Sequence, residues 1–138
     1  MPIAITVREA MDQAVAIGLQ ATVSEAIHKM IQAGIWSLVV ENQGLPVGVV
    51  TDHDVLRRLL ALGGDPNKVK VEDIMSSPII TIEPDVRASD ALKTMIEKKV
   101  SRLYVVANAK IIGRITRKGL SENLLDVMIA LNSVTQQL

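Results

Sequence analysis

The sequence predicts a mixed α/β (α+β) protein made of two β-α-β-β-α units that pack sheet to sheet with pseudo-twofold symmetry. The first observation is that the sequence of the 138-residue chain repeats at a shift of 65 positions, so that Val23, for example, is matched by Ala88. The matching segments are 23–30 with 88–95, 37–40 with 102–105, and 48–51 with 113–116. The second observation is that each copy changes from helical apolar spacing to short apolar runs separated by turn residues.

Each copy opens with a short apolar turn and then a short β segment. The turns place two apolar residues four positions apart, as Val7 with Met11 and as Val71 with Met75. The β segments are predicted at 14–19 and at 79–82. Because a unit of roughly 65 residues buries too little surface to be secure alone, the two copies are expected to share a core.

An amphipathic helix follows in each copy, with apolar residues at helical spacing. These residues are Ala26, Ile27, Met30 and Ile31 in the first copy, and Ala91, Leu92, Met95 and Ile96 in the second. The N-cap is predicted at Thr22 or Ser24 in the first copy, and at Ser89 or Asp85 in the second. Gly34 is expected to end the first helix.

A β-hairpin and a closing helix complete each copy. The first hairpin is predicted from strands 37–41 and 47–51, joined by the turn residues 42–44. The second is predicted in the same way from 102–106 and 111–116, joined by 107–109. A closing helix is expected after Thr51 and again after Thr116. In the second copy its apolar stripe continues through Leu124, Val127, Met128, Leu131 and Val134, and part of this stripe is expected to cover its own sheet. The excess length past the repeat suggests a dimer contact, and the alternative for residues past Ala130 is a core helix with a tail.

The domain boundary is predicted at the turn-rich linker Gly63-Gly64-Asp65-Pro66-Asn67, which gives domains 1–66 and 67–138. Equal numbers of basic and acidic residues, 15 each, make a general nucleic-acid binder improbable, because such proteins need a basic surplus. The absence of cysteine excludes thiol chemistry and disulfides. No apolar run is long enough to span a membrane, and the charged N-terminus is unlike a signal peptide, so a cytoplasmic location is expected.

The repeated segments resemble a known family. The pattern Val-x-x-x-Met, amphipathic helix, hairpin, then Gly48-Val-Val-Thr51-x-x-Asp54, is similar to the cystathionine β-synthase (CBS) domain. Two copies in tandem resemble a Bateman module, and the resemblance covers essentially the whole chain. It implies a regulatory sensor that binds AMP, ADP, ATP, NADH or S-adenosylmethionine in the cleft between the copies. It also implies a disc-like dimer of two modules.

Thr51 and Asp54 have two compatible interpretations. A threonine followed three residues later by an acid is a capping box that closes the first turn of a helix. The resemblance implies that the same two side chains hydrogen-bond ribose, and a carboxylate is able to accept from both vicinal hydroxyls. We expect the second copy to differ, because Gly119 stands where the acid would be, after Thr116. Whether this second cleft binds anything is left open, and one nucleotide per chain is expected.

Basic residues of the second copy predict the phosphate end of the site. Arg117 and Lys118 lie at an expected helix start with no acid beside them, an arrangement that suits an anion. Arg102 is a candidate bidentate phosphate donor. The resemblance implies that basic residues near Arg102 and Lys118 hold phosphate, and Ser101 stands where the family often has histidine. The alternative is that these cations are solvated surface charges.

Three further residues complete the predicted site. Val49 and Ile17 are candidates for an apolar slot that takes adenine, although both are equally suited to the core. His53 is a candidate phosphate contact, with solvent exposure as the alternative. No metal site is expected, because Asp52-His53-Asp54 is contiguous and His28 has no partner at ligand spacing.

The leading interpretation of function is a non-enzymatic, ligand-sensing protein that binds an adenine nucleotide, most plausibly AMP, for energy sensing. Its expected partners are a second copy of the chain and an unidentified regulated protein. The alternative is a structural dimerisation or protein-interaction module without a nucleotide site. An enzyme is disfavoured, since no nucleophile–base pair or convergent carboxylate pair is present.

Overall fold

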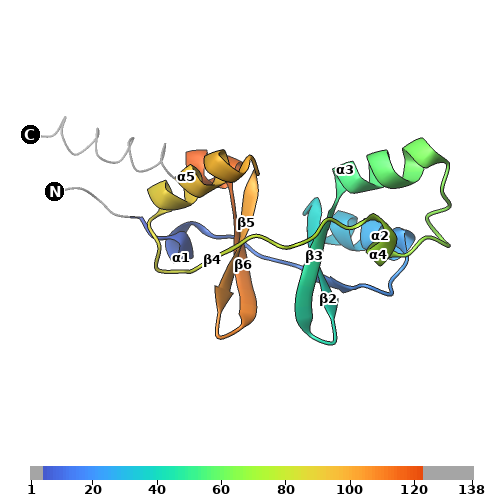
Figure 1. Cartoon of the computed structure of the whole chain (residues 1–138), viewed down its shortest axis with the longest axis horizontal. Helices are drawn as coiled ribbons and strands as arrows, with labels where there is room; N and C mark the ends of the chain where they lie inside the picture. The colour runs from blue at the N-terminus through green and yellow to red at the C-terminus, as the bar shows by residue number, and fades with distance from the viewer. Residues whose placement is uncertain (1–4, 123–138) are drawn as a thin grey trace, which may run out of the picture. The chain divides into compact units, whose positions relative to one another are not determined.

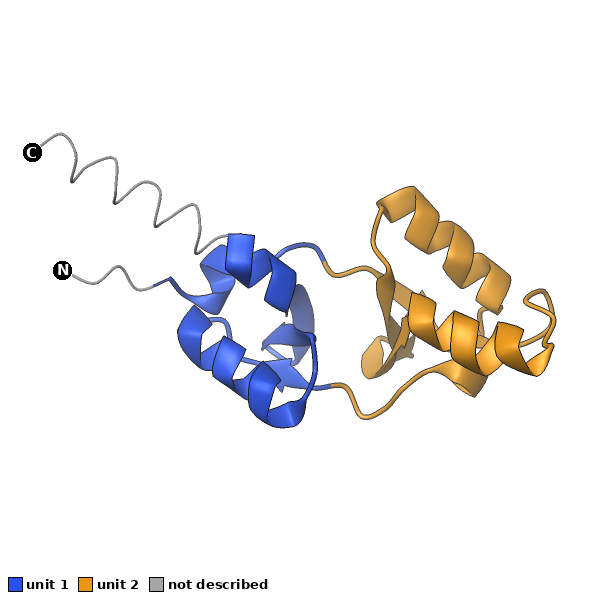
Figure 2. Ribbon diagram, turned by 90° about the horizontal axis from the view of Figure 1, so that it is seen from above, with its two compact units in different colours: residues 1–13, 80–138 blue, residues 14–79 orange. Residues whose placement is uncertain are grey.

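The computed structural model describes residues 5–122. The chain forms two compact units (Figure 2). Unit 2 is the continuous stretch 14–79, whereas unit 1 combines 1–13 with 80–138. The elements come in the order that the repeat predicts, so the two-copy α/β fold is confirmed.

Unit 2 is a three-stranded sheet covered by helices (Figure 1). Its elements are β1 (Ala16–Gly18), α2 (Val23–Ala33), β2 (Ser37–Asn42), β3 (Leu45–Thr51), α3 (Asp52–Asp54), the π-helix η1 (Val55–Leu59), the 3-10 helix η2 (Leu60–Leu62) and α4 (Val71–Ile74). The strand order is β1-β2-β3, with β1 parallel and β3 antiparallel to β2. Gln43 and Gly44 form the hairpin loop, and both have positive φ, as the tight turns of hairpins require.

Unit 1 repeats this sheet with the order β4-β5-β6. Its elements are α1 (Val7–Ala10), β4 (Thr81–Ile82), α5 (Ala88–Lys98), β5 (Arg102–Ala107) and β6 (Lys110–Thr116), after which residues 117–122 are helical. The hairpin loop is Asn108-Ala109, again with positive φ at both residues. The predicted apolar stripe beyond residue 122 lies outside the described residues.

The opening turn of each sequence repeat packs into the unit formed by the other repeat. In unit 1, α1 contacts α5. Val7 and Ala10 are buried in the same core as Met95 and Leu103. The backbone N–H of Val7 donates to the carbonyl of Val86 at 2.8 Å.

Unit 2 holds α4 in the equivalent place. Val71 and Ile74 lie in a core with Met30 and Leu38. The backbone N–H of Val71 donates to the carbonyl of Ala21 at 2.9 Å.

The division by sequence repeat and the division by packing are therefore different. The repeats predict domains 1–66 and 67–138, whereas the compact units change at 13/14 and at 79/80. Each unit takes its sheet and long helices from one repeat, and its short opening helix from the other. The repeat marks the copied sequence, and the unit boundaries mark where the chain crosses from one core to the other.

The helix ends confirm part of the capping prediction. Thr22 is the N-cap of α2, where its hydroxyl accepts from the backbone N–H of Glu25 at 3.2 Å. Gly34 ends this helix in the left-handed conformation, with φ of 66°. The prediction of Ser89 or Asp85 as the second N-cap is wrong. Arg87 occupies that position without a side-chain cap bond, and its neighbour Ala88 instead donates its N–H to the carbonyl of Ile5 at 2.7 Å.

Two equivalent glycines allow the crossing segments, the stretches at Asp12 and at Ser76 by which the chain leaves one unit for the other, to lie directly on the sheets. A Cβ atom on Gly48 of β3 would lie 2.7 Å from the carbonyl oxygen of Ser76. A Cβ atom on Gly113 of β6 would lie 2.9 Å from the carbonyl oxygen of Asp12. The glycine of the repeated motif is thus required by a close backbone approach in both units.

Candidate functional site

Thr51 and Asp54 form the predicted capping box at the start of α3. The carboxylate Oδ2 of Asp54 accepts from the backbone N–H of Thr51 at 2.9 Å and from its hydroxyl at 3.2 Å. The Thr51 hydroxyl in turn accepts from the backbone N–H of Asp54 at 3.3 Å. Asp54 is buried, so its carboxylate is held in one orientation at the end of β3.

Two residues that sequence reasoning missed complete the surroundings of this carboxylate. The hydroxyl of Ser76 donates to Oδ1 of Asp54 at 3.3 Å. The Nε atom of Arg58, on η1, lies 3.9 Å from the same oxygen. Arg58 also donates through Nη1 to the carbonyls of Ile74 at 3.1 Å and Met75 at 2.9 Å. A signal for Arg58 was present in the sequence, since it follows Asp54 by four residues.

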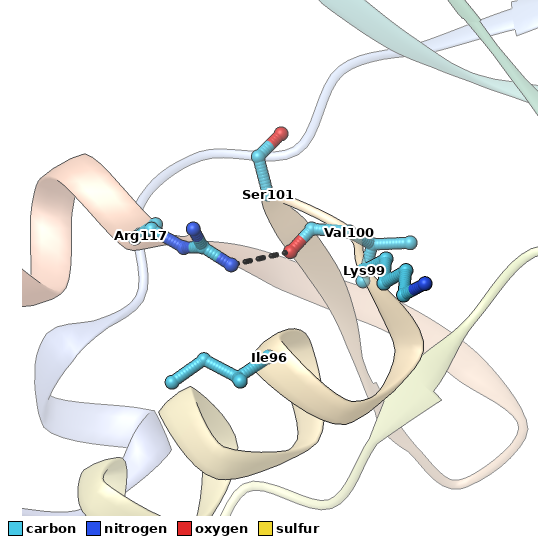
Figure 3. A pocket seen from close by; sticks show the side chains of 5 residues that line it. All are labelled: Ile96, Lys99, Val100, Ser101 and Arg117. Atoms are coloured by element: carbon cyan, nitrogen blue, oxygen red, sulfur yellow. Dashed lines mark hydrogen bonds between the residues drawn. The ribbon is translucent and has the colours of Figure 1, made fainter.

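In unit 1, a pocket brings together two of the predicted phosphate-binding residues, Arg117 and Ser101 (Figure 3). It has a volume of about 480 Å³, and its other lining residues are Ile96, Lys99 and Val100. The guanidinium of Arg117 is directed at the Val100 carbonyl, to which Nη2 donates at 3.5 Å. The backbone N–H of Arg117 donates to the Ser101 carbonyl at 2.9 Å. The pocket lining therefore combines two cationic residues, Lys99 and Arg117, with two apolar ones, Ile96 and Val100.

Lys99 was not among the predicted residues. It ends α5 in the left-handed conformation, with φ of 57°, at the position where unit 2 has Gly34. In Figure 3 its ammonium lies on the other side of Val100 from the Arg117 guanidinium. The consecutive lysines at 98–99, just before Ser101, were the available sequence signal.

Arg102 and Lys118 do not line this pocket. The register of the sheet places Arg102 opposite Thr116, so it lies across the hairpin from the helix start that carries Lys118. The Nε atom of Arg102 is buried and has no hydrogen-bond partner among the described residues. Lys118 is exposed. A buried guanidinium N–H that has no partner within residues 5–122 is a favourable donor for an anion.

The second copy of the motif is built differently. The Thr116 hydroxyl accepts from the backbone N–H of Gly119 at 3.0 Å, so the threonine half of the cap is present without a carboxylate. The crossing segment is instead fixed by an ion pair, in which Nε of Arg114 donates to Oδ1 of Asp12 at 2.8 Å. Asp12 and Arg114 occupy the positions that Ser76 and Val49 occupy in unit 2.

The three remaining predicted residues lie in unit 2. Ile17 is buried in its core, which leaves little of its surface for a ligand. Val49 is half-buried on β3, where its backbone pairs with Ser76. His53 is exposed, and its Nδ1 lies 3.2 Å from Oδ1 of Asp52.

Unit 2 thus holds Ile17, Val49, Thr51, His53 and Asp54, and unit 1 holds the basic residues and Ser101. Within residues 5–122, no three His, Asp or Glu side chains are grouped so that they could hold a metal ion. No helix in the same range is long and apolar enough to cross a membrane.

Comparison with known proteins follows the repeat. The family model for the CBS domain matches the chain twice, at residues 7–61 and 71–126. An uncharacterised protein of Methanopyrus kandleri is 38% identical over 97 residues, which cover 69% of this chain and 50% of the relative. The chain therefore spans half the length of that relative.

Solved structures match over most of the chain. A conserved protein of Pyrococcus horikoshii, described as uncharacterised, is similar with a TM-score of 0.79 and 27% identity. That match covers 89% of this chain and 94% of the other. A hexameric CBS-CP12 protein from bloom-forming cyanobacteria is similar with a TM-score of 0.78 and 26% identity, over 86% of this chain and 67% of the other.

Proposed function

The chain belongs to the CBS-domain family as a tandem pair, and from this premise we propose that it is a regulatory protein that binds an adenine nucleotide. The observation that carries the proposal is the Asp54 carboxylate, which is buried, ionisable and fixed by Thr51, Ser76 and Arg58. A fixed acceptor at the end of a strand is what recognition of ribose hydroxyls needs.

The phosphate of the nucleotide is proposed to bind to the basic residues of unit 1. Three observations support this assignment: the buried Nε of Arg102, which has no partner in the described part of the chain, the exposed Lys118, and the pocket that Arg117 and Ser101 line. Lys99 adds a further cation at the same pocket. Two or three cations suit one phosphate, so AMP is the preferred ligand among AMP, ADP, ATP, NADH and S-adenosylmethionine.

The role is proposed to be sensing rather than catalysis. A protein whose described part consists of CBS units is of the regulatory kind, and a nucleotide would act by favouring one arrangement of the chain that a partner protein recognises. The partner that would recognise this arrangement is a regulated protein of unidentified class. Adenine is proposed to lie against Val49 and the edge of Ile17, and His53 is proposed to face solvent near the phosphate.

Thermal unfolding of the full chain tests the proposal. The panel contains AMP, ADP, ATP, NADH, S-adenosylmethionine and buffer alone. A nucleotide at 100 times its dissociation constant adds about 2.7 kcal/mol of stability, which raises the unfolding temperature by several degrees. Asp54→Asn is expected to remove this shift, and Lys118→Ala to reduce it.

Asp52→Asn is the matched control, because it removes the same charge at a position two residues before Asp54. The hydrogen bonds of the Asp52 carboxylate are to the backbone N–H and Nδ1 of its neighbour His53. A shift with AMP that persists in Asp54→Asn contradicts the site. If none of the compounds in the panel shifts the unfolding temperature, that result contradicts nucleotide sensing as a whole.

A second candidate is a self-association or protein-interaction module without a nucleotide. Large apolar side chains of unit 2 are exposed, with Trp36 at 54%. The others are Ile31, Leu45, Leu56, Leu60 and Leu62. Such side chains are suited to a homodimer contact. This candidate predicts a firm dimer by light scattering and no effect of any nucleotide on stability.

A further inference from the structure

The lone pairs of the Asp54 carboxylate are nearly all in use. Oδ2 accepts two hydrogen bonds, from the backbone N–H and the hydroxyl of Thr51. Oδ1 accepts one, from the hydroxyl of Ser76 at 3.3 Å. Arg58 lies 3.9 Å from Oδ1, which is too far for a hydrogen bond but close enough for charge attraction. Because a carboxylate has about four acceptor positions, one position on Oδ1 is left.

A ribose that donates both vicinal hydroxyls to Asp54 needs two positions. The two on Oδ2 belong to the cap that begins α3, so releasing them would unwind the helix start. The hydrogen bond from Ser76 is long, at 3.3 Å, and comes from outside the cap. Because Ser76 is exposed, its hydroxyl is able to turn to water. The second ribose hydroxyl must therefore replace the hydroxyl of Ser76.

Ser76 lies on the segment by which the chain leaves unit 2. Its backbone N–H donates to the Val49 carbonyl at 2.8 Å, and its carbonyl accepts from the Val49 N–H at 2.9 Å. Three residues later, after residue 79, the chain enters unit 1. Arg58 binds the two carbonyls just before Ser76, those of Ile74 and Met75. The carboxylate and the guanidinium thus fasten one short stretch of backbone.

We propose that the hydroxyl of Ser76 is a tether that a ribose diol displaces from Asp54, while Arg58 keeps the carboxylate in place. Ser76 is then a positioning residue, through which an occupied site loosens the crossing segment 76–79. This inference rests on the proposed function, since it requires a ribonucleotide at Asp54. Unit 1 has no such device, because Asp12 and Arg114 fasten its crossing segment by an ion pair and Gly119 provides no carboxylate.

The test compares AMP with 2′-deoxyAMP in calorimetric titrations of the full chain and of Ser76→Ala. A single ribose hydroxyl uses the free position, so the affinity for 2′-deoxyAMP is expected to stay the same. AMP must displace Ser76 in the wild type but not in the variant, so Ser76→Ala is expected to bind AMP about three- to tenfold more tightly, the worth of one hydrogen bond. Ser76→Thr retains a hydroxyl, so the ratio of its affinity for AMP to its affinity for 2′-deoxyAMP is expected to equal that of the wild type. Ser89→Ala is the control, because Ser89 is an exposed serine of α5 in unit 1.

Amide hydrogen exchange gives a second readout. On addition of AMP, exchange of the backbone N–H groups of Ser76 and Val49, which donate to each other's carbonyls, is expected to rise in the wild type and not in Ser76→Ala. If Ser76→Ala changes the affinities for AMP and 2′-deoxyAMP equally, or changes neither, the tether is overturned and nucleotide binding remains intact. Exchange of the Ser76 and Val49 amides that falls or stays constant in the wild type also overturns it. If neither nucleotide binds either protein, the proposed function fails and the tether fails with it.

Discussion

The two units have the same strand order, and each holds its crossing segment on the sheet by a reciprocal pair of backbone hydrogen bonds, Ser76 with Val49 and Asp12 with Arg114. The side-chain contacts that add to these backbone bonds differ between the units. In unit 2 the fastening is a buried carboxylate, Asp54, that holds the hydroxyl of Ser76. In unit 1 it is the Asp12–Arg114 ion pair, and Gly119 replaces the carboxylate. The comparison teaches that the shared apolar and glycine positions are compatible with different polar contacts at the same place in the fold.

The largest expected effect comes from the feature that both units share. Gly48→Ala and Gly113→Ala each place a Cβ atom within 3 Å of a backbone carbonyl, and neither carbonyl can move without disturbing the crossing segment. Each variant is expected to lose about 1–3 kcal/mol of stability, as overpacked sites do. Urea unfolding measures this loss.

Gly18→Ala is the matched control, because a Cβ atom there meets nothing within 4 Å. It is expected to change the free energy of unfolding by less than about 0.5 kcal/mol. A loss at Gly48 without an equal loss at Gly113 would show that the close approach matters in one unit only.

The next effect sharpens the difference between the units. Gly119→Asp recreates the Thr-x-x-Asp pattern in unit 1, where the Thr116 hydroxyl is already bonded to the backbone N–H of residue 119. The new carboxylate completes a capping box, and a helical glycine is removed, so a gain of about 1 kcal/mol is expected in thermal unfolding.

Gly119→Ala separates the two causes, since it supplies helix propensity without the carboxylate. If the carboxylate is what a ribose requires, titration of Gly119→Asp with AMP is expected to show two sites per chain in place of one. Equal stability of Gly119→Asp and Gly119→Ala would contradict the capping contribution.

The smallest expected effect concerns the helix ends. Gly34 and Lys99 both end a helix at positive φ, and the lysine carries a side chain where glycine has no steric cost. Lys99→Gly is therefore expected to stabilise the chain by about 0.5 kcal/mol, and Gly34→Ala to destabilise it by about 1 kcal/mol. Differential scanning calorimetry compares the two, and a loss of stability in Lys99→Gly would show that its side chain packs usefully in unit 1.

Much of the fold was predictable because its signals are local. Helical spacing around Met30 and Met95 and the turn residues of the two hairpins placed every long element within a few residues of its position. The second N-cap was not predictable, because Arg87 caps nothing and the helix start is instead satisfied by a backbone bond from a segment more than 80 residues away in the chain.

The site was predictable in its motif and not in its surroundings. Thr51 and Asp54 are three residues apart, so their mutual bonds follow from helix geometry. Ser76 lies in the other sequence repeat, and its bond to Asp54 exists only because the opening turns are exchanged between the units. No spacing within one repeat carries that information.

The exchange of opening turns also makes the two units unequal in chain connectivity. Unit 2 is one uninterrupted stretch, so it is an insert within unit 1, whose two parts are joined only through it. When residues 14–79 are folded, they hold residues 13 and 80 at a fixed separation. When they are unfolded, unit 1 must close a loop of that length, at an entropic cost of about 3–4 kcal/mol by the logarithmic scaling of loop closure. The insert therefore acts as a folded clamp for its host, and because such a coupling is reciprocal, a folded unit 1 favours the folding of unit 2 by the same free energy.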